Sequence, residues 1–244
     1  MGDREWTVVS LEGACMTQRE GPALARIEPR LAPGSIKLLF PGLPDFELRS
    51  ARIAPRIDVR IWGSTFSAFD EGDAVAGWLA MALGSPVRLA RFDPSVQRTS
   101  DSRWTQGVKT LNRFSDGFPM LLASQASLAD FNSRWTQEGH RPLPMDRFRP
   151  NLVVDGIGAY EEDHLAALIA DGIELRPVKP CARCSIPSVD QITGEVGASP
   201  LEVLAGYRFN RGIGGAAFGQ NLIAARGQGA VLRVGMQLTE QWNF

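Results

Sequence analysis

The residues with the clearest potential for chemistry are two cysteines three positions apart, Cys181 and Cys184, with Arg183 between them. Cysteine thiolates bind soft metals and act as nucleophiles, and a neighbouring guanidinium favours the thiolate form. The segment follows a predicted strand and runs into Pro187, a context that argues against a helix beginning at the cysteines. The thiols are therefore the first candidates for a reactive or metal-binding site.

Four interpretations of this pair are open on the residues alone. A zinc site needs four nitrogen or sulfur ligands, and only Cys15, His140 and His164 are available in addition, without paired spacing. A thioredoxin-like dithiol needs a helix N-terminus directly after a strand, which the β-prone context disfavours. The two remaining interpretations are a buried structural pair and a single thiolate ligand to a soft metal.

A second polar group stands directly before the predicted strand Leu152–Val154, where Arg147 and Arg149 lie close to Asn151 in the sequence. Pro150 fixes an extended backbone between them. Several N–H donors in a small space suit a phosphate or an electron-rich heterocycle. Arginines near a surface turn are otherwise solvated, so this group alone does not define a site.

The composition excludes several classes of protein. Of 244 residues, 44% are hydrophobic and 22% are charged, which is typical of a globular chain and excludes disorder as the main state. The formal net charge of −1 argues against a general nucleic-acid binder or a membrane-surface protein. Three cysteines without a signal peptide indicate a reducing compartment, and no apolar run approaches the roughly 18 residues that span a bilayer. We expect a cytoplasmic protein.

The elements that must position these residues are mostly short β-prone runs punctuated by Gly and Pro. They predict strands at Trp6–Val9, Ala23–Ile27, Ile36–Phe40, Phe46–Leu48, Val59–Trp62, Val87–Leu89, Phe118–Leu122, Leu152–Val154, Ile173–Leu175, Leu222–Ala225, Val231–Val234 and Gln237–Leu238. Apolar spacing predicts helices over Asp73–Leu83 and about Ser127–Trp135, and Ser199 with Pro200 marks a third helix start.

These elements predict a mainly β fold with a few short helices, arranged as two β-barrel-like domains that pack together. The polar stretch from Asp93 to Thr110 predicts a long loop, which we expect to contain the domain boundary. We therefore expect one domain over residues 1–95 and a second over residues 96–244.

Two longer stretches, Arg147–Val154 and Lys179–Glu195, resemble the MOSC domain family. The resemblance is to its two-domain branch, an N-terminal MOSC β-barrel plus a MOSC domain, which includes the mitochondrial amidoxime-reducing component and bacterial relatives. Further matches are Gly2–Trp6, Thr17–Glu20, Ser124–Asp130 and Phe218–Gln220.

The resemblance implies a molybdenum–molybdopterin cofactor, with Cys184 as the protein ligand to molybdenum and the catalytic residue. The positions that it implies on the cofactor side are Arg4, Asp116, Gly117, Phe118, Arg149, Asn151, Ala182 and Arg183. The residue types are consistent with this assignment, because a cysteine thiolate can bind the metal and arginines can bind a phosphate. Without the family, however, they do not distinguish Cys184 from Cys181.

The resemblance further implies a reductase of N-hydroxylated small molecules, such as hydroxylamino-purines and amidoximes. The chain has no cysteines left for an iron–sulfur cluster, so we expect electrons from a ferredoxin, a flavodoxin or a reductase-type protein. Two alternatives are a sulfur carrier that uses a Cys184 persulfide and a non-catalytic protein that binds the cofactor. Relatives of this branch carry a further strand before the segment that matches Gly2–Trp6, so we expect the first barrel to lack its N-terminal strand.

Overall fold

The computed structural model describes residues 2–51 and 54–243, and the fold is mainly β, as the sequence predicts. The described residues form four α-helices: α1 (Asp73–Leu83), α2 (Ser102–Thr105), α3 (Gln125–Gln137) and α4 (Pro200–Arg208). The chain divides into two compact units. The N-terminal unit consists of residues up to Arg98 together with Arg113–Asp116 and Val189–Gly197; the C-terminal unit consists of Thr99–Asn112, Gly117–Ser188 and Ala198 onward.

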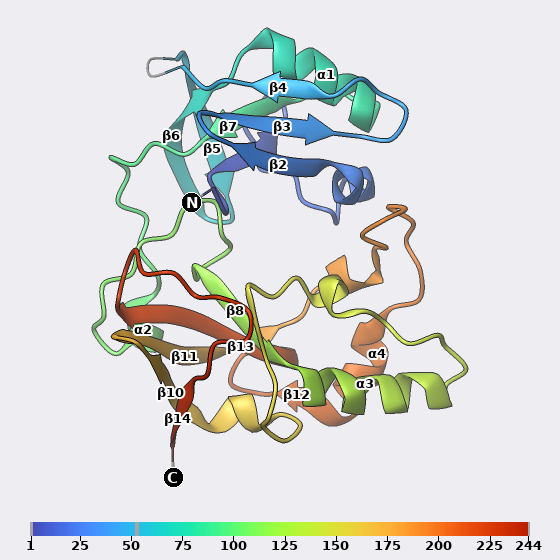
Figure 1. Ribbon diagram of the computed structural model, residues 1–244. Helices are drawn as coiled ribbons and strands as arrows, with labels where there is room; N and C mark the ends of the chain where they lie inside the picture. Colours follow the sequence, from blue (N-terminus) through green and yellow to red (C-terminus); the bar gives the residue numbers. More distant parts are fainter. Residues whose placement is uncertain (1, 52–53, 244) are drawn as a thin grey trace. The chain divides into compact units, whose positions relative to one another are not determined.

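Two antiparallel sheets build the N-terminal unit (Figure 1). Its strands are β1 (Trp6–Val9), β2 (Glu28–Ala32), β3 (Ser35–Leu39), β4 (Phe46–Leu48), β5 (Arg56–Ile61), β6 (Ser64–Asp70) and β7 (Arg88–Arg91). One sheet has the order β1-β7-β6-β5 and the other β2-β3-β4. Helix α1 buries Val75, Trp78 and Leu79 in a core that also takes in β3, β4 and β7.

The segment Gly13–Met16 closes the four-stranded sheet into a ring by pairing with both of its outer strands. The Cys15 N–H donates to the Arg60 carbonyl oxygen on β5 at 3.0 Å, and the Met16 N–H donates to the Val8 carbonyl oxygen on β1 at 2.9 Å. A ring leaves fewer backbone groups unpaired than an open sheet does. The N-terminal unit thus contains a small barrel, in agreement with the predicted fold class.

Gly13 is required for this closure. Its φ is +79°, and a Cβ at this position would lie 1.9 Å from the Asp58 carbonyl oxygen, so no other residue fits without moving the backbone. Inside the ring, the aromatic side chains of Phe66, Phe92 and Phe114 contact one another with ring centroids 5.4 to 5.9 Å apart. Phe114 belongs to the segment Arg113–Asp116, which explains why that segment packs with the N-terminal unit.

A single larger sheet builds the C-terminal unit. Its strands are β8 (Met120–Ser124), β9 (Leu152–Val154), β10 (Leu165–Ala170), β11 (Ile173–Ala182), β12 (Phe209–Asn210), β13 (Gly215–Arg226) and β14 (Thr239–Trp242). The order is β14-β10-β11-β13-β8-β9, with β12 beside β13. Figure 1 shows α3 and α4 close together, where they contact β8 and β13 respectively.

Strand β11 carries the chain to the cysteine pair and contains two prolines, Pro177 and Pro180. Proline cannot donate to a strand ladder, so it is tolerated at edges and bulges. Of the residues of β11, only Ile173–Leu175 pair with β10, and both prolines lie beyond this pairing. The register between β11 and β13 also shifts next to each proline. The end of β11 is therefore an edge with bulges, which leaves the backbone near the cysteines free of a second neighbour from β10.

The start of α3 is fixed by a buried carboxylate. Ser124 is the N-cap, and its hydroxyl accepts the Ser127 N–H at 3.0 Å. The fully buried Glu162 accepts hydrogen bonds from both serine hydroxyls, at 3.0 Å from Ser124 and 2.7 Å from Ser127. A buried carboxylate is costly unless it is hydrogen-bonded. These contacts therefore hold the start of α3 against the segment that contains Glu162.

Several predicted elements differ from the structure. The predicted strand Ala23–Ile27 is wrong: Pro22–Arg26 is a 3-10 helix, for which Pro22 supplies the first residue. The predicted strand Val231–Val234 is also wrong, since these residues are irregular and Val234 is fully exposed. The strand predicted at Gln237–Leu238 begins later, at Thr239, and β2, β6 and β10 were not predicted. Within residues 2–51 and 54–243, no helix has both the length and the hydrophobicity needed to cross a bilayer.

Candidate functional site

A buried aromatic cluster supports the backbone next to the cysteine pair. Phe148 ends the 3-10 helix η2 (Met145–Phe148) and is fully buried. Its ring stacks on Phe218 of β13 with centroids 4.0 Å apart and meets Phe131 of α3 edge-on at 5.4 Å. Large buried aromatic rings fix backbone positions strongly. The main-chain atoms of η2 are therefore well placed to hold polar partners.

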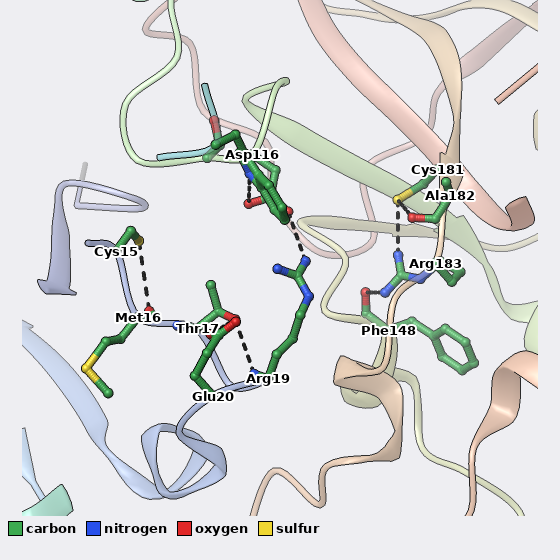
Figure 2. A network of polar contacts seen from close by, with 12 residues as sticks. Cys15, Met16, Thr17, Arg19, Glu20, Asp116, Phe148, Cys181, Ala182 and Arg183 are labelled. Carbon is green, nitrogen blue, oxygen red and sulfur yellow. Dashed lines mark hydrogen bonds and ion pairs between the residues drawn. The ribbon is translucent and has the colours of Figure 1, made fainter. Parts of the chain in front are cut away.

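Arg183 connects this helix to the cysteines. Its Nη2 donates to the Phe148 carbonyl oxygen at 2.8 Å, and its Nη1 donates to the Sγ of Cys181 at 3.2 Å (Figure 2). Its backbone N–H donates to the Ala216 carbonyl oxygen on β13 at 2.9 Å. Arg183 thus contacts Cys181 and fixes the chain immediately before Cys184.

Arg147 fixes the chain immediately after Cys184. Its Nη1 donates to the carbonyl oxygens of Pro187 and Ser188, at 3.4 and 3.2 Å. These residues belong to the short 3-10 helix η4 (Ile186–Ser188), in which the Ser188 N–H also donates to the Ser185 carbonyl oxygen at 3.0 Å. Cys184 therefore lies in a short loop that is tied to η2 on both sides by arginine side chains.

The environment of the thiols distinguishes between the four interpretations of the pair. Cys181 and Cys184 are free and partly exposed, so a buried structural pair is wrong. Strand β11 ends at Ala182 and is followed by the three-residue η4, not by the α-helix that a thioredoxin-like dithiol needs. In the part of the chain that the structure describes, no three His, Cys, Asp or Glu side chains are grouped closely enough for a zinc site. A single thiolate ligand to a soft metal is the interpretation that agrees with this environment.

The residues at this loop fit a molybdenum–pterin group. The Nε of Arg183 is a buried donor that has no hydrogen-bond acceptor among the residues that the structure describes. A buried unsatisfied N–H is destabilising, and a bound anionic group is one source of the missing acceptor. A soft thiolate at Cys184 and the guanidinium of Arg183 together supply a metal ligand and a positive charge in one short segment.

Two more predicted residues lie at the end of η2. Arg149 is exposed and has a φ of +55°, and its N–H donates to the Asp146 carbonyl oxygen at 3.0 Å. Asn151 is held against β8: its N–H donates to the Leu121 carbonyl oxygen at 2.9 Å, and its Oδ1 accepts the Leu121 N–H at 3.0 Å. Asn151 thus has a structural role at the start of β9. The cofactor contacts predicted for both residues stay predictions.

The other predicted residues are divided between the two units. Arg4 and Asp116 belong to the N-terminal unit, where the Arg4 carbonyl oxygen accepts the Phe114 N–H at 3.0 Å. Gly117 and Phe118 belong to the C-terminal unit, and the Gly117 carbonyl oxygen accepts the Asn112 side chain at 2.8 Å. The exposed Ala182 ends β11 in the same unit. Within one unit, the structure brings together Ala182, Arg183 and Cys184 next to η2.

The sequence analysis missed the roles of Phe148 and Arg147. Phe148 was identifiable only as one aromatic residue between two arginines, and nothing in the sequence indicates that it stacks on Phe218. Arg147 was grouped with Arg149 as a donor for a ligand. Its partners are main-chain oxygens 40 and 41 residues further along the chain, so only the fold identifies it as a positioning residue.

The chain is thus mainly β and has two units, and its half-buried Cys184 lies in a loop that Arg183 and Arg147 hold. Residues 1–86 match the MOSC N-terminal beta barrel domain, and residues 109–239 match the MOSC domain. The chain belongs to the MOSC family.

Its curated relatives include mitochondrial amidoxime-reducing components. Component 1 of Mus musculus is 32% identical over 212 residues, which is 84% of this chain and 61% of the relative. Component 1 of Homo sapiens is 32% identical over 212 residues, 84% of this chain and 62% of the relative. The chain thus spans about three fifths of the length of these relatives. A solution structure from Bordetella bronchiseptica is 25% identical, covers 36% of this chain and 72% of its own, and has a TM-score of 0.34, too low to support a conclusion.

Proposed function

We propose that this protein is a molybdenum–molybdopterin-dependent oxidoreductase that reduces N-hydroxylated compounds, such as hydroxylamino-purines and amidoximes. The observation that carries the proposal is the free, half-buried Cys184, held in a loop whose two sides are tied to η2 by Arg183 and Arg147. The distant relationship to proteins named for amidoxime reduction supports the choice of substrate class.

The overall reaction consumes two electrons and two protons, breaks the N–O bond of an N-hydroxylated substrate and yields the N–H product and water. When bound, the molybdenum–pterin group supplies the two-electron redox chemistry. A separate electron-donor protein of the ferredoxin, flavodoxin or reductase type supplies the electrons.

The residues of the chain have three roles in this proposal. Cys184, as the thiolate, binds the metal and so fixes its position on the C-terminal unit. Arg183 and the exposed Arg149 balance the negative charge of the pterin phosphate. Arg147 is a positioning residue, because it acts on Cys184 only through the backbone of Pro187 and Ser188.

The test compares metal content and turnover among cysteine variants produced in cells that make the cofactor. We expect Cys184→Ser to lose bound molybdenum and to lose reduction of a hydroxylamino-purine with a ferredoxin and its reductase. The neighbouring Cys181→Ser is the matched control and should retain molybdenum. Equal molybdenum in wild type and Cys184→Ser would contradict the proposal. One added sulfur atom on Cys184 by mass spectrometry, without molybdenum, would favour a sulfur carrier instead.

A further inference from the structure

Trp62 occupies a position that is unfavourable for folding. It is the first residue of the two-residue loop between β5 and β6, because Ile61 pairs with Ser64 across the hairpin. Its φ is +52°, a conformation in which glycine or asparagine is preferred and a bulky residue is strained. The side chain also remains 65% exposed, so burial of the ring does not offset this strain. A costly residue of this kind points to a function other than packing.

The exposed indole is nevertheless held in place by two side chains of the N-terminal unit. Its Nε1 donates to the Oδ1 of Asp116 at 3.3 Å. The Arg19 guanidinium carbon lies 4.9 Å from the ring centroid, and its Nη2 lies 3.7 Å from the Oδ2 of Asp116. Figure 2 shows the Arg19 side chain extended toward Asp116. Asp116 thus holds the N–H edge of the ring, and the Arg19 guanidinium lies near its face. Much of the indole surface nevertheless stays exposed.

Arg19 is itself fixed by a compact turn. The Thr17 hydroxyl donates to Glu20 at 2.7 Å, and the Arg19 N–H donates to the same hydroxyl at 3.2 Å. The preceding Gln18 is buried and exchanges two amide hydrogen bonds with Gln191, at 2.9 and 3.0 Å. The turn therefore fixes the backbone from which the Arg19 side chain extends to Trp62.

An exposed, fixed indole next to a carboxylate suits one class of ligand. A planar nitrogen heterocycle stacks on the open part of the ring, and base–aromatic stacking tolerates different bases because every base has a π-face. The carboxylate of Asp116, with a side chain that is 64% exposed, can accept a hydrogen bond from an exocyclic N–H. A small aliphatic substrate would gain nothing from such a surface.

We propose that Trp62, fixed by Arg19 and Asp116, is a stacking site on the N-terminal unit for planar nitrogen heterocycles such as purine bases. This binding site goes beyond the proposed reductase function and does not depend on it.

The test uses the cofactor-loaded full chain and three variants. Trp62→Gly removes the ring and places glycine at a positive φ, so this variant should be at least as stable as the wild-type protein. Trp62→Phe keeps an aromatic ring and is the conservative variant. Trp104→Ala is the matched control, because Trp104 also lies against a cation, 5.1 Å from the Lys179 ammonium, but belongs to the C-terminal unit.

Saturation-transfer NMR with adenine as the probe measures this stacking. We expect wild type to show transfer to adenine and Trp62→Gly to lose it, with the affinity for adenine falling by about 10-fold or more, the effect of losing one stacked base. Trp62→Phe should recover most of the transfer, and Trp104→Ala should resemble wild type. Equal transfer in wild type and Trp62→Gly would overturn the proposal.

A probe without a ring shows whether the site selects planar heterocycles. Acetamidoxime should show weak transfer that is the same in wild type and Trp62→Gly, because it has no aromatic face to stack on the indole. If transfer to acetamidoxime depends on Trp62 as strongly as transfer to adenine does, the site is not selective for heterocycles and the proposal is wrong.

Discussion

Replacing Phe148 by leucine tests whether the aromatic cluster positions the Cys184 loop. Phe148 and Phe131 are both fully buried in the same cluster, with ring centroids 5.4 Å apart. A buried Phe→Ala substitution costs about 3–5 kcal/mol, so the smaller change to leucine should cost about 1–2 kcal/mol at either position. At about 2–4 °C per kcal/mol, the unfolding midpoint of each variant should fall by roughly 2–8 °C.

The two variants should differ at the loop, although they cost similar stability. Phe148 supplies the carbonyl oxygen that accepts Arg183, whereas no hydrogen bond to the loop comes from Phe131 among the contacts described above. Phe148→Leu keeps the main-chain carbonyl that accepts Arg183 but removes the stacked ring that positions it. A hydrogen bond to a charged group contributes about 1.5–3 kcal/mol, so losing its alignment should speed local opening by about tenfold or more. Hydrogen exchange of the Ser188 amide, which donates to Ser185 in the folded loop, measures this opening.

The comparison also defines the result that refutes the reasoning. Mass spectrometry of alkylated peptides reports Cys184 separately, and its alkylation should speed up in Phe148→Leu more than in Phe131→Leu. If both variants change exchange at Ser188 and alkylation of Cys184 equally, the loop responds to general destabilisation. The proposed connection through Phe148 and Arg183 would then be wrong.

Three further predictions concern the N-terminal unit. Gly13→Ala should destabilise the barrel by about 3 kcal/mol in urea unfolding, because its Cβ would meet the Asp58 carbonyl oxygen; unchanged stability would contradict the ring closure. Hydrogen bonding to Ser95, and then to an arginine, lowers the pKa of Asp93 to about 2, below its unfolded value near 4. The stability that Asp93 adds should therefore be complete above about pH 4 and be lost toward pH 2, and Asp93→Asn should abolish that part of the urea midpoint's pH dependence. Burial raises the pKa of the Cys15 thiol, so its alkylation rate should level off at a higher pH than that of the same thiol in the urea-unfolded protein, and a plateau at the same pH would refute this.

The sequence itself determined the class of fold and identified the cysteine pair as a chemical feature. Short β-prone runs between Gly and Pro specify strands locally, and the apolar spacing of Asp73–Leu83 specifies α1, whose observed bounds match the prediction. Cys181, Arg183 and Cys184 lie within four positions of the chain, so they are recognised as a chemical feature without any tertiary information. Such signals lie within a few residues, where local physical chemistry decides them.

Only the tertiary structure decided which arginine holds the loop. Arg147 and Arg149 look equivalent in the sequence, yet Arg147 donates to backbone oxygens of η4 while Arg149 is exposed. Likewise, the sequence predicts Trp62 as the end of a strand, but the structure places it at a hairpin tip, where Arg19 and Asp116 reach it from distant segments. Contacts over such separations depend on how buried strands and aromatic rings pack. A local pattern carries no information about that packing, because the partners meet only when the whole core has formed.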